Sequence, residues 1–164
     1  MRLKNLLSKG YFSEELPPPF SSSLLGINTR KIFSIVDSLS PAEKSKLRET
    51  DYVRFSIPKV GIHRRRNGIP NPYHYVLLSR VLFKNWKFIK KHFKISQLSA
   101  SIPTVDPKGH RAIVQFEKYE EFKEKCIECS YDTLYELRAD ISKYFPSIYT
   151  HSISWALHTK YKFL

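Results

Sequence analysis

Apolar residues recur every three to four positions in three stretches of this chain, and that spacing places them on one face of a helix. It predicts helices over residues 1–10, 73–93 and 116–127. Gly10 closes the first helix, because glycine readily takes the left-handed conformation that ends helices. In the second, Lys84 and Lys87 fall outside the apolar face, so they lie either in a solvated surface or along a path for a polyanion.

A fourth helix is predicted from its start signal. Ser40 suits the N-cap, Pro41 suits the first helical position, and Glu43 completes a capping box. Further back, prolines 17–19 lack amide donors and favour an extended polyproline arm. The apolar residues around this arm are expected to pin it to the body of the protein; they are Tyr11, Phe12, Leu16 and Phe20.

Alternation of apolar and polar residues over 53–57 predicts a half-buried strand. Gly61 and the pair Asn67-Gly68 are turn signals, so this strand is expected to open a β-hairpin. The three arginines at 64–66 would then stand at a cationic tip, where guanidinium groups present paired donors to phosphate oxygens. An exposed charged loop is the plainer interpretation of the same segment.

A second strand is expected over 134–139, a half-apolar run that leads to Asp140 and a turn rich in aromatic and hydroxyl side chains. Residues 101–111 are loop-like, because prolines and glycines interrupt them. The elements together predict an α+β fold, mostly helical, with a basic β-hairpin and an incomplete antiparallel sheet. A length of 164 residues fits one ordinary domain.

The chain is strongly basic. Its 28 lysines and arginines outnumber 15 acidic residues, which gives a net charge of +13. That excess indicates a polyanionic partner, because phosphate contacts with basic side chains supply most of the affinity for nucleic acid. Basic residues also stand beside aromatic ones, a pairing that suits base stacking. The candidate nucleic-acid contacts are His63, Lys84, Lys87 and Arg111; a merely solvated basic surface is the alternative.

Cys126 and Cys129 form a C-x-x-C pair without a second pair to complete a zinc site. Metal or redox use is one interpretation, and small apolar residues of a helix is the one we favour. No run of about 18 apolar residues predicts a membrane span, and residues 1–10 lack the apolar core of a signal peptide. We therefore expect no membrane partner and a cytoplasmic location.

Asp140 is the acid with the most distinctive setting. A carboxylate at the end of a strand, held by a rigid element, suits a divalent cation such as magnesium. Asp is also a common helix cap, so Asp140 could instead cap a helix that starts at Ile141. The residue types alone leave both interpretations open.

The segment 140–160 closely resembles the first conserved acidic block of the palm in reverse transcriptases, nearest to bacterial enzymes of the abortive-infection and antiphage-defence type. Residues 57–59, Arg65 and 68–72 are similar to the fingers block of these enzymes. Residues 6–12 and 15–20 resemble their amino-terminal lead. The resemblance implies three segments: a helical lead with a Pro-rich arm (1–50), a fingers-like region (51–130) and the start of the palm of a right-hand polymerase (131–164).

The resemblance also implies a reaction, in which a primer 3′-oxygen attacks the α-phosphate of a deoxynucleotide and pyrophosphate leaves. Asp140, with the Ile141 carbonyl, would bind the catalytic magnesium ions, and Phe145 would exclude a ribose 2′-hydroxyl. Lys59 and Arg65 would face the incoming triphosphate, with Arg64 and Arg66 as helpers. RNA, DNA and deoxynucleoside triphosphates are the implied partners, with a role in phage defence.

The sequence departs from the family at one decisive point. Two-metal chemistry needs further carboxylates, which the family supplies from a later block with paired aspartates, and this sequence contains no Asp-Asp pair. We therefore expect an amino-terminal piece of a polymerase, inactive alone, that lacks the rest of the palm and the thumb. The alternative is a non-catalytic nucleic-acid-binding module that uses the basic fingers surface.

Overall fold

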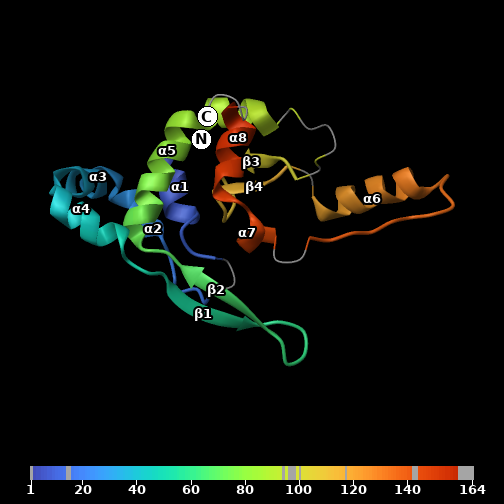
Figure 1. Cartoon of the computed structure of the whole chain (residues 1–164), viewed down its shortest axis with the longest axis horizontal. Helices are drawn as coiled ribbons and strands as arrows, with labels where there is room; N and C mark the ends of the chain where they lie inside the picture. The colour runs from blue at the N-terminus through green and yellow to red at the C-terminus, as the bar shows by residue number, and fades with distance from the viewer. Residues whose placement is uncertain are drawn as a thin grey trace. The chain divides into compact units, whose positions relative to one another are not determined.

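The computed structural model describes residues 2–13, 16–93, 95, 99, 101–116, 118–141 and 144–158, without the side chains of Phe145 and Pro146. It is α+β, as predicted, with helices in the majority and two small two-stranded antiparallel sheets (Figure 1). The helices are α1 Leu3–Lys9, α2 Ser23–Ile27, α3 Thr29–Ser38, α4 Pro41–Arg48, α5 Pro72–Phe93, α6 Tyr119–Ser130, α7 Tyr144–Ser147 and α8 Thr150–His158. The strands are β1 Val53–Pro58, β2 Arg64–Ile69, β3 Pro103–Val105 and β4 Ile113–Gln115.

Two compact units make up the chain. The first comprises Met1–Lys87 and Pro103–Val114, and the second comprises Phe88–Ile102 and Gln115–Leu164. The first unit therefore joins the amino-terminal helices, the β1–β2 hairpin and most of α5. The expected division at residues 50 and 130 follows the family resemblance, and it stays a prediction.

The hydrophobic core of the first unit forms where α1, α3 and α5 meet. Leu7, Val36 and Val76 are its buried residues, one from each helix. The predicted apolar face of α1 is confirmed, because Leu6 is buried beside Leu7. On α5 the buried face centres on Val76 and Ser79, whereas Leu78, counted in the predicted apolar stripe, is exposed.

Helix boundaries follow the predicted signals with one correction. The capping box at Ser40 forms, with the Ser40 Oγ accepting from the Glu43 amide and the Glu43 carboxylate accepting from the Ser40 amide. Gly10 does end α1, but with φ −118° rather than in the left-handed region. Glycine is needed there for space: a Cβ at this position would collide with the hydroxyl of Tyr75.

The proline segment is pinned as expected but is not extended. The Phe20 amide donates to the Pro17 carbonyl at 2.9 Å, so prolines 18 and 19 occupy a turn. The Phe12 and Phe20 rings meet edge to face, 5.8 Å between centroids. The Tyr11 hydroxyl donates to the Pro70 carbonyl at 2.6 Å. A hydrogen-bonded turn therefore stands where an extended polyproline arm was expected.

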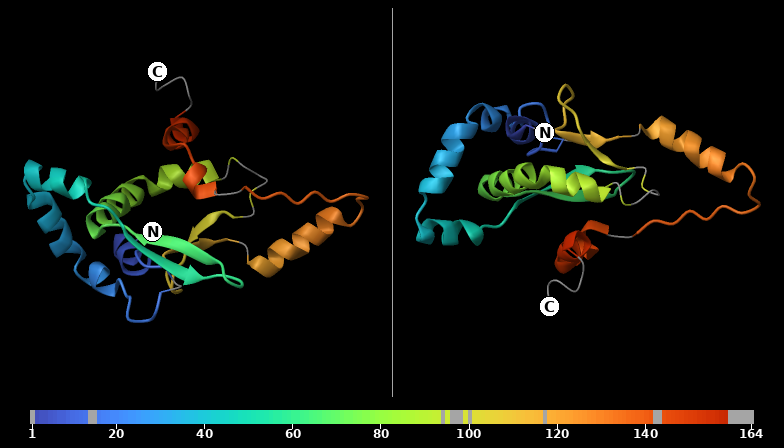
Figure 2. Two further views of the ribbon diagram at one scale, coloured as in Figure 1. Left: turned by 60° about the horizontal axis from the view of Figure 1, so that its bottom comes forward. Right: turned by 90° about the horizontal axis from the view of Figure 1, so that it is seen from above.

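The hairpin turns at one place only. Gly61 has φ +66°, which glycine adopts without strain, and it lies between β1 and β2. Asn67 and Gly68, predicted as a turn, lie inside β2 and pair with Phe55 and Arg54. The arginines 64–66 therefore run along the second strand and do not stand at a tip. Figure 2 shows the two strands side by side up to the turn that joins them.

The loop expected at 101–111 contains the short strand β3, which pairs with β4. Asp106 organises the connection by accepting from the amides of Lys108 and Gly109 at 2.9 and 2.7 Å. The Lys9 ammonium donates to the carbonyls of Pro107 and Gly109. These contacts tie the β3–β4 connection to the end of α1, within the first unit.

In the second unit, α6 confirms the helix predicted over 116–127, and the predicted strand at 134–139 does not form. Residues 134–140 carry no regular structure and pair with none of the residues that the structure describes. An extended segment becomes a strand only when its amides and carbonyls find a partner strand. Leu134, Tyr135 and Leu137 are each more than 90% exposed.

Candidate nucleic-acid interface

The β1–β2 register sorts the basic residues of the hairpin onto two faces. Arg64 pairs with Pro58, Arg65 with Ile57 and Arg66 with Ser56. Because successive side chains of a strand point to opposite faces, Arg65 projects from one face and its two neighbours from the other. The cluster of three arginines expected from the sequence is therefore divided between the two faces.

One face, which we call the Lys59 face, carries Lys59, His63 and Arg65. The Lys59 amide donates to the His63 carbonyl at 2.9 Å, which extends the ladder one pair beyond the strands. Lys59 lies two residues from Ile57, the cross-strand partner of Arg65, so alternation places these two cations on the same side as diagonal neighbours. All three side chains are exposed. Two long cationic side chains thus start from one side of the ribbon.

The opposite face, which we call the Tyr52 face, carries these residues: Tyr52, Arg54, Ser56, Arg64, Arg66 and Gly68. Its centre is a hollow of about 560 Å³. Arg64 is fixed at one end, where its Nε donates to the Ser56 Oγ at 2.8 Å and its Nη2 to the Ser56 carbonyl at 3.0 Å. Tyr52 lies at the other end, against Gly68.

Tyr52 and Arg54 were not predicted as site residues. The Arg54 guanidinium lies 5.3 Å from the centroid of the Tyr52 ring, and one of its nitrogens lies 3.9 Å from a carboxylate oxygen of Asp51. The available signal was the alternation of the strand itself, which extends back from Ser56 through Arg54 to Tyr52. Their importance depends on the register of β2, which the sequence did not reveal.

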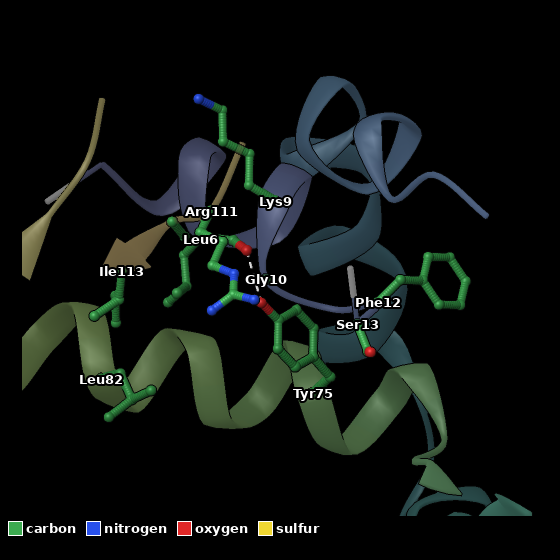
Figure 3. Close-up of a pocket in the computed structure, with 10 residues that line it drawn as sticks. Leu6, Lys9, Gly10, Phe12, Ser13, Tyr75, Leu82, Arg111 and Ile113 are labelled. Atoms are coloured by element: carbon green, nitrogen blue, oxygen red, sulfur yellow. Dashed lines mark hydrogen bonds between the residues drawn. The ribbon is translucent and has the colours of Figure 1, made fainter. Parts of the chain in front are cut away.

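The other predicted nucleic-acid contacts lie away from the hairpin strands. Lys84 and Lys87 are exposed and one turn apart on α5. Arg111 lines a pocket of about 380 Å³ together with Gly10, Tyr75 and other residues. In Figure 3 its guanidinium lies beside the Tyr75 hydroxyl, which donates to the Leu6 carbonyl at 2.6 Å. Burial raises the pKa of the Tyr75 hydroxyl above its ordinary value.

Asp140 is exposed and lies in the extended segment of the second unit. It does not cap a helix at Ile141, because the next helix, α7, begins at Tyr144. Among the described residues, no three His, Cys, Asp or Glu side chains gather where a metal ion could bind. Magnesium asks for a nearly complete octahedron of oxygens, of which Asp140 and the Ile141 carbonyl would supply two, so the described residues around them form at most part of such a site. The side chain of Phe145 lies outside the described residues.

The C-x-x-C pair lies on α6, with Cys126 half-buried and Cys129 exposed, both as free thiols. This agrees with the helical interpretation. None of the helices within the described ranges is long and apolar enough for a membrane crossing.

Comparison with known proteins adds no identification. No family model, no curated protein and no solved structure matches the chain.

Proposed function

We propose that the chain is the amino-terminal part of an RNA-directed DNA polymerase of the bacterial antiphage-defence type. Its hairpin then serves as the fingers, and the Lys59 face receives the triphosphate of an incoming deoxynucleotide. The observation that supports this most is the register, which puts Lys59 and Arg65 on one side of the ribbon. These are the two cations that the resemblance assigns to the triphosphate.

The chemistry of the two side chains fits that role. Arginine offers a planar fork of donors that matches a phosphate, and lysine offers a compact point charge. Diagonal neighbours across a strand pair lie about 7–8 Å apart at Cα, within reach of long side chains that converge on one polyphosphate. In the transfer step the primer 3′-oxygen bonds to the α-phosphorus as the bond to pyrophosphate breaks. Lys59 and Arg65 would offset the negative charge that grows on the leaving group.

For the palm, the proposal assigns roles to residues of this chain and includes no metal-dependent step. Asp140 and the Ile141 carbonyl would contribute oxygens to Mg²⁺, and Phe145 would select against a ribose 2′-hydroxyl. Two-metal chemistry needs further carboxylates, and this sequence contains no Asp-Asp pair. In the proposal these carboxylates belong to the rest of the palm, which, like the thumb, is a partner of this segment. The proposal includes RNA and DNA as partners and a cytoplasmic setting.

The experiment that tests the proposal measures binding of a fluorescent deoxynucleoside triphosphate to the whole chain. Hydrogen bonds to charged groups contribute about 1.5–3 kcal/mol, so Lys59→Ala and Arg65→Ala should each weaken binding about tenfold to a hundredfold. Arg64→Ala is the matched control, because Arg64 projects from the opposite face and its guanidinium is hydrogen-bonded to Ser56. Equal losses from Arg64→Ala and Arg65→Ala would contradict the proposal.

A second candidate function is a nucleic-acid-binding module without catalysis. It is favoured by the exposed, isolated position of Asp140 in the described structure. It predicts salt-sensitive binding of RNA or DNA with no preference for a triphosphate over a monophosphate. Competition between the two nucleotides for the same site separates the candidates, because a fingers site favours the triphosphate.

A further inference from the structure

We infer that the Tyr52 face is a binding surface for single-stranded nucleic acid, with Tyr52 as the platform for one base and Arg54 and Arg66 as phosphate contacts. This surface lies on the opposite side of the hairpin from Lys59 and Arg65. It depends on the geometry of the hairpin and not on the proposed triphosphate site.

The Tyr52 ring packs against the backbone of Gly68. A Cβ at position 68 would collide with Cδ2 and Cε2 of the ring, so the ring lies on the bare backbone of Gly68. Glycine within a strand lowers its stability, and it commonly marks a close approach of another group. Here the approaching group is an aromatic ring that remains 50% exposed. The Arg54 guanidinium also lies over this ring, 5.3 Å from its centroid, so a base would stack on the exposed part of the ring beside this cation, as bases stack on aromatic side chains.

Charged side chains lie beside the ring. Three exposed arginines project from this face, at positions 54, 64 and 66. Arg54 lies 3.9 Å from a carboxylate oxygen of Asp51. Arg64 is committed to two hydrogen bonds with Ser56. Arg54 and Arg66 line the hollow beside Tyr52 and are the cations in position to meet phosphates that flank a stacked base. Cationic groups next to an aromatic ring suit a polyanion with flat apolar units.

The ligand that fits this surface is a single strand. The hollow is lined by Tyr52 and by residues of β1 and β2 that include Arg54 and Arg66, so it offers a ring to one base and cations to the phosphates beside it. In a duplex the faces of the bases are covered by their neighbours, so Tyr52 would have nothing to stack on. Every base offers a π-face, so the expected binding tolerates sequence.

The test measures the fluorescence anisotropy of a fluorescein-labelled 12-nucleotide oligothymidylate and of its oligouridylate counterpart, with the whole chain. Tyr52→Ala should weaken binding at least about fivefold, the effect of losing one stacked base. Tyr52→Phe keeps the ring and should bind within about twofold of the unmodified chain. Far-ultraviolet circular dichroism of each variant establishes that it is folded, and Tyr52→Phe keeps the test decisive if the alanine variant is not.

The phosphate contacts have their own matched pair. Arg66→Ala should weaken binding and reduce the slope of log affinity against log salt by about one. Arg30→Ala removes an exposed arginine from α3 and should leave affinity within about twofold. Lys59→Ala should weaken triphosphate binding about tenfold to a hundredfold and leave binding of the single strand within about twofold, so failure of the triphosphate site and failure of this surface are distinguishable.

Three results would overturn the inference. One is full binding by a folded Tyr52→Ala variant, and another is an equal loss from Tyr52→Phe and Tyr52→Ala. The third is competition by a 12-base-pair duplex as effective as competition by the unlabelled single strand. Each of these outcomes would show that no base stacks on Tyr52.

Discussion

Gly10 and Tyr75 illustrate how a single residue type can be needed for a reason different from its usual one. Gly10 has an ordinary backbone conformation, φ −118°, which any residue adopts. Its lack of a side chain admits the Tyr75 hydroxyl, which in turn donates to the Leu6 carbonyl of α1. Gly10 correctly predicted where the helix ends, but glycine is needed there because Tyr75 of α5 occupies the space beside it.

Gly10→Ala should therefore destabilise the first unit by about 1–3 kcal/mol, the typical cost of overpacking. The effect should shrink but not vanish when Tyr75→Phe is made as well, because the clash with the hydroxyl is then removed while the tight 3.0 Å contact with the Leu6 carbonyl oxygen remains. Urea unfolding of the two single variants and the double variant measures the coupling. Additive effects would contradict the steric explanation.

A run of arginines in the sequence does not reveal which of them share a face, as positions 64–66 show. As a run they indicate a phosphate-binding loop, yet consecutive residues of a strand cannot share a face. The sequence identified the residue types correctly and left their grouping open. The register, with Arg65 opposite Ile57, groups Arg65 with Lys59 instead of with its neighbours.

Among the secondary-structure elements, those with local signals were predicted well. The capping box at Ser40 and the apolar spacing of α1, α5 and α6 lie within a few residues of the elements they specify. The failures are elements that depend on a partner. Asn67-Gly68 reads as a turn but is taken into β2 because Gly61 already reverses the chain. Residues 134–139 have strand-like residues, but no partner strand among the described residues.

One contact between elements is open to a pH test. Arg80 of α5 donates to both carboxylate oxygens of Asp37 of α3, at 2.7 and 3.0 Å, and its guanidinium lies 4.2 Å from the centroid of the Phe33 ring. The hydrogen bond from Arg80 is the main cause that lowers the pKa of Asp37 below its ordinary value of 3.8. This carboxylate is therefore easier to ionise in the folded chain than in the unfolded chain.

Because the folded pKa is depressed, this stabilisation is present above the unfolded pKa and is lost as pH falls through the folded pKa. The melting temperature of the unmodified chain should exceed that of Asp37→Asn near neutral pH, and the difference should close as the pH falls below 3.8. Other carboxylates titrate equally in both proteins, so the comparison isolates Asp37. A difference that is independent of pH would contradict the account.

At the scale of the whole molecule, the two compact units differ in how much they bury. The buried hydrophobic residues of the described chain, which are Leu6, Leu7, Val36, Val76 and Ala112, all belong to the first unit. In the second unit the segment before Asp140 exposes large apolar side chains, and its backbone pairs with no strand within the described ranges. Such a segment is prone to associate with other strands and is accessible to proteases.

Limited chymotrypsin digestion of the whole chain should therefore cut first at Leu134, Tyr135 or Leu137, which are 92–93% exposed. Equivalent sites in the core, such as Leu7, should be cut much later. Tyr135→Lys, which adds charge to the segment, should raise the soluble fraction after purification. Initial cleavage within α5, or a single sharp melting transition that includes Trp155, would argue against this picture.

The central claim is that the hairpin separates its basic residues into two faces with different ligands. Nuclear magnetic resonance of the arginine side-chain Nε–Hε groups, recorded during titration with a deoxynucleoside triphosphate and then with a single-stranded oligonucleotide, tests it directly. The triphosphate is predicted to shift the Nε–Hε resonance of Arg65 and to leave those of Arg54 and Arg66 unchanged. The oligonucleotide is predicted to shift the resonances of Arg54 and Arg66 and to leave that of Arg65 unchanged. A triphosphate that shifts Arg66 as strongly as Arg65 would contradict the claim.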